Sequence, residues 1–161
     1  MEILRGHFIV KEIDMIPSDP SKPWVKTKNK IFSKVSRIYA IAETKEIEFT
    51  LDVNTEIYKI FSGDKLDLLI LEHEFKQVEN GYNQQFQPNW LDFFRKDKID
   101  EYEYVMYGTV FHSGIEKNKS FFYASFGGLL LKVFGVLKNN SINFLKTDSN
   151  ILLLIRKKTI E

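Results

Sequence analysis

The three histidines are the side chains best suited to binding a metal or transferring a proton. They are His7, His73 and His112, and each stands in a different segment without a second ligand nearby. Zinc requires three or four Cys, His or carboxylate ligands at compatible spacing, and this chain contains no cysteine. The sequence therefore predicts no metal site and no cofactor.

The sequence also lacks the motifs of nucleophilic or acid–base catalysis. Ser113 follows His112, but sequence neighbours rarely form a catalytic pair, and neither a Gly-x-Ser-x-Gly elbow nor a cysteine nucleophile is present. Residues 63–65, Gly-Asp-Lys, lack the leading glycine and following helix of a phosphate-binding loop and predict a hairpin turn. Four carboxylates before a predicted strand are interpreted as solvated charge: Asp97, Asp100, Glu101 and Glu103. We predict no catalytic residue and no intrinsic enzymatic activity.

A cluster of cations lies between residues 22 and 37, with Trp24 and Phe32 interleaved. Cations neutralise phosphates while aromatic rings stack on bases, so the pattern is typical of non-specific single-strand binding. The residues predicted to contact single-stranded DNA are Lys26, Lys28, Lys30, Lys34 and Arg37. In the alternative interpretation, solvated lysines only keep an edge strand from aggregating.

The chain as a whole produces no strong electrostatic field, because its 23 Lys and Arg residues nearly balance its 22 Asp and Glu residues and leave a net charge of +1. Neither nucleic acid nor an anionic membrane is therefore recruited by global charge. The first residues lack the pattern of a secretory signal peptide, and no apolar run approaches the ~18 residues of a membrane helix. The absence of cysteine fits a reducing compartment, so we expect a soluble intracellular protein.

Alternating apolar and polar residues at 46–53 predict a strand with one solvated face. Helical periodicity is nowhere sustained. Further strands are predicted at 3–13, 34–42, 65–72, 101–111, 121–135 and 150–157, with a weaker one at 141–146. Short turns between such strands favour a single all-β domain over residues 1–161, a barrel or a sandwich. Gly127-Gly128 favours the barrel if it bends one long strand at a corner, although a simple hairpin turn explains the pair equally well.

Two long loops interrupt this pattern. The basic loop at 14–33 holds three of the four prolines, and the loop at 73–98 is rich in Gln and Asn. Within the second loop, residues 89–94 predict one helical turn whose aromatic rings dock on the barrel. A partner-binding peptide is the alternative.

Five blocks resemble one known family. They are KVSRIYA at 34–40, LDVNTEIYKIFSGDKLDLLI at 51–70, EYVMYGTV at 103–110, ASFGGLLLKVFG at 124–135 and TDSNILLLIRK at 147–157. Together they resemble the small eighth subunit shared by eukaryotic DNA-directed RNA polymerases I, II and III. The chain departs from the family pattern at Lys59, where proline is usual, and at Lys132, where arginine is usual. Its first loop is also longer than usual.

The resemblance implies an eight-stranded antiparallel barrel related to the OB-fold. It implies a nuclear, non-catalytic subunit that docks on the largest polymerase subunit, contacts other subunits and supports transcription. Magnesium and nucleotide chemistry would belong to the largest subunit. The family's association with single-stranded DNA corresponds to residues 14–50, which include the cation cluster. A free-standing single-strand-binding OB-fold protein is the alternative function.

The tyrosine-rich strand suggests how docking occurs. Residues 102, 104 and 106 face one side and residues 103, 105 and 107 the other, and both sets are largely apolar. One set is expected to fill the barrel while the other forms a hydrophobic outer patch typical of a permanent interface. The alternative is that long loops cover that face. The predicted interface residues are Tyr104, Met106, Tyr107, Gly108, Phe126, Gly127, Gly128, Leu129 and Leu130.

Overall fold

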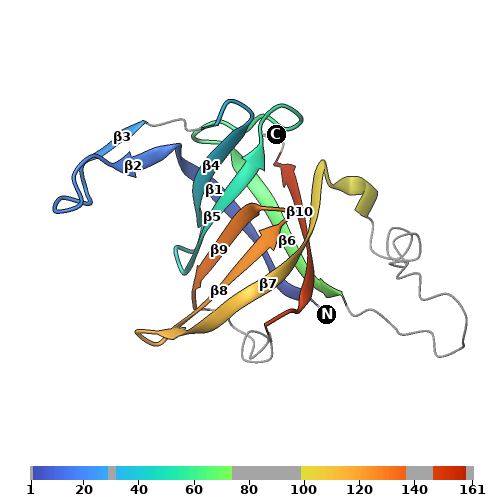
Figure 1. Cartoon of the computed structure of the whole chain (residues 1–161). Helices are drawn as coiled ribbons and strands as arrows, with labels where there is room; N and C mark the ends of the chain where they lie inside the picture. Colours follow the sequence, from blue (N-terminus) through green and yellow to red (C-terminus); the bar gives the residue numbers. More distant parts are fainter. Residues whose placement is uncertain (1, 29–31, 74–98, 137–146, 159–161) are drawn as a thin grey trace, which may run out of the picture.

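Eight antiparallel strands close into a barrel in the computed structural model, which describes residues 2–28, 32–73, 99–136 and 147–158 (Figure 1). Around the barrel the order is β1-β4-β5-β9-β8-β7-β10-β6. The strands are β1 (Glu2–Ile13), β4 (Val35–Ala42), β5 (Ile47–Asn54), β6 (Lys65–His73), β7 (Tyr104–Glu116), β8 (Lys119–Phe126), β9 (Leu129–Gly135) and β10 (Asn150–Lys157). The only helical turn in the described ranges is the 3-10 turn η1 (Ile99–Glu101). The predicted eight-stranded barrel is confirmed.

Strand β5 illustrates how the alternating sequence gives the barrel a hydrophobic interior. Phe49, Leu51 and Val53 are buried inside the barrel, while the alternating Glu48 and Thr50 lie on its outer side. Because a strand turns successive side chains to opposite faces, the alternation in the sequence becomes one filled interior and one outer surface.

Strands β6 and β10 differ, because they are apolar on both faces. Their inward residues join the barrel core, whereas Leu69, Leu71, Leu152 and Leu154 form a second cluster on the outer side. None of these four leucines is more than 8% exposed. The barrel wall therefore carries hydrophobic packing on both of its surfaces here.

The region 121–135 corrects the interpretation of Gly127-Gly128. Phe126 pairs with Leu129, so the two glycines form a two-residue hairpin turn between β8 and β9 rather than a bend in one long strand. Their φ angles are +62° and +104°, which L side chains rarely adopt and glycine tolerates.

The basic loop also differs from the prediction, because part of it forms strands β2 (Met15–Pro17) and β3 (Lys26–Lys28). This β2–β3 hairpin projects from the barrel (Figure 1). Asp14 anchors its base: its N–H donates to the Arg37 carbonyl at 2.8 Å, and its carboxylate accepts from the Arg37 N–H at 3.0 Å. Pro17 ends β2, and Pro20 and Pro23 lie in the connection to β3, so the prolines do not prevent the hairpin.

The predicted helical turn at 89–94 and the predicted strand at 141–146 lie outside the described residues. Within the described ranges, no helix is long and apolar enough to span a membrane.

Candidate docking surface

Three predicted interface residues lie inside the barrel. Tyr104, Met106 and Phe126 are only 6%, 9% and 6% exposed. The Tyr104 ring stacks on Tyr58 at 5.2 Å, and its hydroxyl accepts a hydrogen bond from the Asn54 N–H at 3.2 Å. Burial raises the pKa of Tyr104, so the hydroxyl stays neutral. A partner could reach these side chains only by opening the barrel.

Gly108, also a predicted interface residue, serves packing within the barrel. A Cβ atom at this position would lie 2.4 Å from the Ser125 carbonyl oxygen and 2.5 Å from the Phe126 ring. The space beside Gly108 is thus already filled by β8.

Tyr107 does face outward, as one of the two alternatives for this strand predicted. Its ring packs, with Tyr102 and Val105, against the outer leucine cluster of β6 and β10. Leu154 in that cluster has no exposed surface. The leucines of this face are therefore covered, while Tyr102, Val105 and Tyr107 lie half-buried over them.

The remaining predicted interface residues lie together on the β8–β9 hairpin. Gly127 and Gly128 are exposed at the turn, and Leu130 is 41% exposed on the outer face. Leu129 is half-buried and packs against the core from the other side. Among the predicted interface residues, Leu130 is the apolar side chain with the greatest exposure to solvent.

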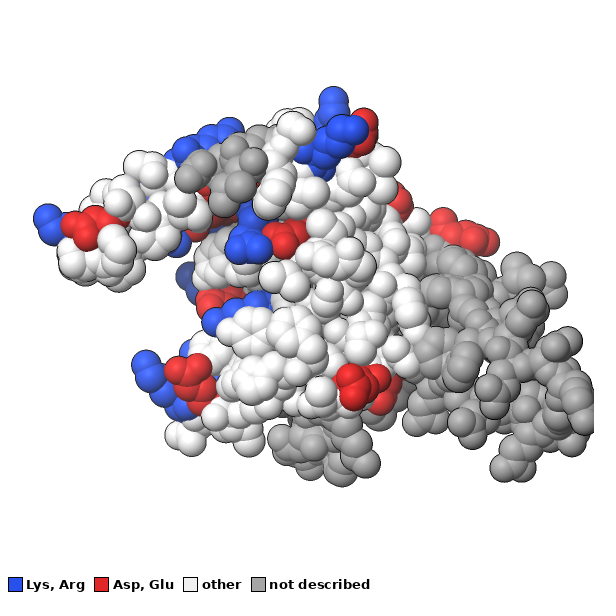
Figure 2. Space-filling model, viewed as in Figure 1, with Lys and Arg blue, Asp and Glu red and all other residues white. Residues whose placement is uncertain are grey.

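A groove lies between this hairpin and the projecting β2–β3 hairpin. Its volume is about 270 Å³. Its apolar lining comes from both sides: Met15, Ile16, Phe32, Val35 and Leu129. We call this opening the hairpin groove. Figure 2 shows that the molecule is hollowed beneath the projecting hairpin on this face.

An ion pair holds the floor of the hairpin groove. The Arg37 guanidinium donates to both carboxylate oxygens of Asp52, at 2.7 and 3.1 Å, and the Leu130 N–H donates to the same carboxylate at 3.0 Å. The hydrogen bond to Asp52 raises the pKa of Arg37. Asp52 is 7% exposed, so one buried carboxylate ties β4 and β5 to the hairpin. The sequence alternation placed Asp52 on the solvated face and gave no signal of this role.

An aromatic face adjoins the hairpin on β7, β8 and β9. Its rings contact one another at centroid distances of 5.4 to 6.0 Å: Phe111, His112, Phe121 and Tyr123. A β-bulge between Val110 and His112 places both Phe111 and His112 on the outer side. The predicted interface did not include these residues, because all four lie just outside the two sequence blocks, 103–110 and 124–135, that contain the predicted interface residues.

Two lysines lie over the aromatic face. Lys132 is 5.6 Å from the Tyr123 ring and 5.9 Å from the Phe134 ring, and Lys119 is 5.4 Å from Phe134. Contact of an ammonium with a ring is worth about 0.5–1 kcal/mol at an exposed site. The arrangement is an apolar surface with charged groups at hand, as expected where a protein interface meets its polar rim.

Most of the predicted DNA-contacting cations are already paired. Lys26 bonds Glu12 at 2.8 Å, Lys34 lies 3.5 Å from Glu56, and Arg37 bonds Asp52. Lys28 has no ion pair in the described part of the chain, and Lys30 lies outside it. Figure 2 accordingly shows acidic and basic groups intermixed on this face. Pairs with carboxylates leave less positive charge for a phosphate backbone.

Within the described ranges, no group of three or more His, Cys, Asp or Glu residues is placed to hold a metal ion.

Comparison with known proteins matches residues 24–157 to the family described as RNA polymerase Rpb8. A Caenorhabditis elegans relative, "Probable DNA-directed RNA polymerases I, II, and III subunit RPABC3", is 33% identical over 80% of this chain and 85% of its own length. The Saccharomyces cerevisiae subunit RPABC3 is 32% identical, covering 78% of this chain and 87% of itself. The Dictyostelium discoideum subunit rpabc3 is 30% identical over 96% of both chains.

Proposed function

The chain belongs to the RNA polymerase Rpb8 family, and we propose that it docks on the largest polymerase subunit through the hairpin groove. It is a structural subunit of DNA-directed RNA polymerase and contributes to transcription without a catalytic role of its own. The observation that carries the docking proposal is the apolar surface left open on both sides of the groove. On one side Leu130 is exposed next to the lining residue Leu129, and on the other the exposed Met15 and Ile16 line the groove.

The exposure of the β2–β3 hairpin favours its burial against a partner. An isolated two-stranded hairpin is marginally stable in water, and all six residues of β2 and β3 are exposed. Apolar side chains on such a hairpin gain stability when a partner covers them. The groove floor is fixed by Asp52, so a partner meets a preformed surface and loses less conformational entropy on binding.

The test is one charge placed at the rim of the groove, at the exposed Leu130 next to the lining residue Leu129. We expect Leu130→Glu to weaken binding to the largest subunit by about 2 kcal/mol or more, the effect of a hot-spot residue, because the partner would bury an unpaired carboxylate. Ile115→Glu is the matched control, because Ile115 is an equally apolar residue, 67% exposed, on the β7–β8 hairpin. Both variants should fold. Equal yields of the largest subunit on copurification of the two variants would refute the proposal.

We also propose that the protein acts in the nucleus and contacts further polymerase subunits. The names of the curated relatives support this, since they describe subunits of RNA polymerases I, II and III. Imaging of a tagged chain tests the location.

Contact with single-stranded DNA stays a prediction, and the pairing of Lys26, Lys34 and Arg37 with carboxylates argues against a strong one. A binding constant that falls steeply with salt, and that Lys28→Gln reduces, would support it.

A further inference from the structure

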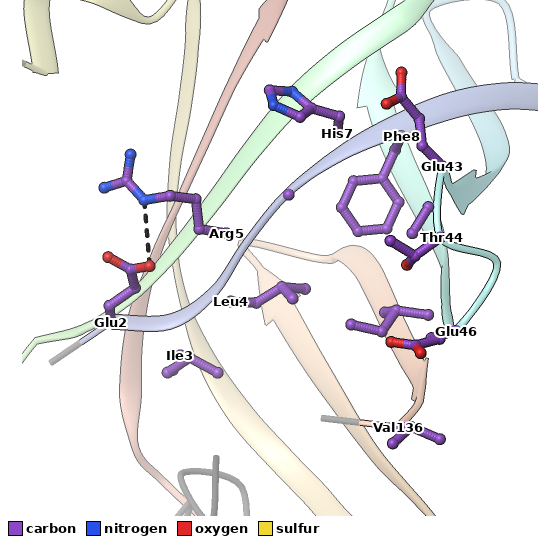
Figure 3. Close-up of a pocket in the computed structure, with 13 residues that line it drawn as sticks. Glu2, Ile3, Leu4, Arg5, His7, Phe8, Glu43, Thr44, Glu46 and Val136 are labelled. Carbon is purple, nitrogen blue, oxygen red and sulfur yellow. Dashed lines mark hydrogen bonds and ion pairs between the residues drawn. The ribbon is translucent and has the colours of Figure 1, made fainter. Parts of the chain in front are cut away.

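A second pocket lies beside the N-terminal half of β1. Its volume is about 390 Å³, and it shares no lining residue with the hairpin groove. Figure 3 shows its walls, which come from β1, from the turn between β4 and β5, and from Val136 after β9. We call it the β1-edge pocket.

Strand β1 extends past the end of its neighbour β4. Its pairing with β6 runs from Glu2 to Ile9, whereas its pairing with β4 begins only at Phe8, opposite Ala42. Among the described residues, the part of β1 before His7 therefore has a strand on one side and the pocket on the other.

The main-chain groups of Arg5 point to the pocket side. Val10 bonds the segment before β6, through Asp64 and Gly63, whereas the His7 carbonyl accepts from the Glu43 N–H at 3.0 Å on the β4 side. Odd-numbered residues of this stretch thus face β4, because a strand directs alternate peptide groups to the same edge. No register shift intervenes between Leu4 and Ile9. The Arg5 N–H and C=O are consequently open, with no partner in the described part of the chain.

The charged side chains of the pocket that form no ion pair with a described residue are acidic. Glu43 and Glu46 are exposed on the turn between β4 and β5 and form no ion pair with a described residue. Arg5 is held by Glu2 at 3.2 Å, and His7 is bonded to Asp67. Apolar contact is available from Ile47 and Val136.

We propose that the β1-edge pocket receives an extended segment of a neighbouring polymerase subunit. Its main chain pairs with Arg5, and a Lys or Arg of that segment meets Glu43 and Glu46. An open strand edge is a template for a further strand, and main-chain hydrogen bonds supply affinity in this mode. A polypeptide fits better than nucleic acid, because two unpaired carboxylates repel phosphate. This inference rests on membership of the polymerase subunit family and is independent of the hairpin groove.

Amide hydrogen exchange tests the pairing directly. In the isolated full-length chain the Arg5 amide should exchange fast, while the Gly6 amide, which faces β6, exchanges slowly and serves as the internal control. In polymerase purified through a tag on this chain, the Arg5 amide should slow by about 100-fold or more, because an added strand protects it as other core strand amides are protected. Exchange that stays fast in the complex would overturn the proposal. So would protection already present in the isolated chain, or protection that nuclease treatment removes.

Charge variants test the chemistry of the occupant. Replacing both carboxylates, Glu43→Gln with Glu46→Gln, should weaken assembly about 3- to 10-fold, as two exposed ion pairs would. Lys45→Gln is the matched control, since Lys45 lies on the same turn but does not line the pocket. If the double variant and Lys45→Gln weaken assembly equally, the proposal that the bound segment carries a Lys or Arg is wrong. Normal copurification of the largest subunit with an unprotected Arg5 amide would end this inference and leave the hairpin groove intact.

Discussion

Removing the Asp52 carboxylate should loosen the β8–β9 hairpin and destabilise the barrel. Asp52→Ala deletes the acceptor of the Leu130 N–H and the partner of Arg37. A hydrogen bond to a charged group contributes about 1.5–3 kcal/mol. The Arg37 side chain is 58% exposed, so its ion pair adds only about 0.2–1 kcal/mol after solvent screening. The expected loss is therefore about 3 kcal/mol in the free energy of unfolding.

Urea denaturation and thermal melting measure that loss. For a chain of this size, about 3 kcal/mol corresponds to a fall in Tm of about 6–12 °C. Arg37→Gln separates the two contributions, because it removes the ion pair and leaves the Asp52–Leu130 hydrogen bond in place. It should cost about 1 kcal/mol or less. If Arg37→Gln destabilises as much as Asp52→Ala, the hairpin is not held in the way described.

Three further outcomes follow from single side chains. Tyr104→Phe loses only the hydrogen bond from Asn54, so it should lower stability by about 1 kcal/mol and leave copurification of polymerase unchanged; reduced copurification with unaltered melting would contradict its place in the core. Gly135→Ala should lower stability by about 3 kcal/mol or more, because the new Cβ would lie 2.3 Å from the Glu46 carbonyl oxygen. Gly127→Ala should cost only about 1–2 kcal/mol, because the space beside Gly127 is open and only its positive φ is unfavourable for alanine. Equal melting temperatures of the two variants would refute this. Burial opposes ionisation of Asp67, but hydrogen bonds from His7 and Arg156 prevail and lower its pKa. The stability that it contributes is present above the unfolded pKa of about 3.9 and is lost as pH falls through the folded value, so Asp67→Asn should flatten the acid end of the stability profile.

The sequence predicted the barrel because its strands obey a two-residue period. That period assigns Tyr104 and Met106 to one face and Val105 and Tyr107 to the other. It does not say which face is inside when both are apolar. Packing against residues distant in the chain decides which face is inside. Here Tyr104 and Met106 face inward, and the Tyr104 ring stacks on Tyr58.

The candidate site was only partly predictable for a similar reason. Gly127, Gly128 and Leu130 were predicted as interface residues because they stand in one block, whereas Asp52 acts on Leu130 across 78 positions in the sequence. The pairing of Lys26 with Glu12 joins residues 14 positions apart, so a local count of cations overstated the free positive charge. Packing between distant strands, and not composition, determined both outcomes.

The most direct test of the docking surface is site-specific photo-crosslinking in assembled polymerase. A photoreactive residue at Leu130 should crosslink to the largest subunit, while the same residue at Ile115, on the β7–β8 hairpin, should not. Crosslinking of the largest subunit from Ile115 and none from Leu130, in a complex of normal composition, would contradict docking through the hairpin groove.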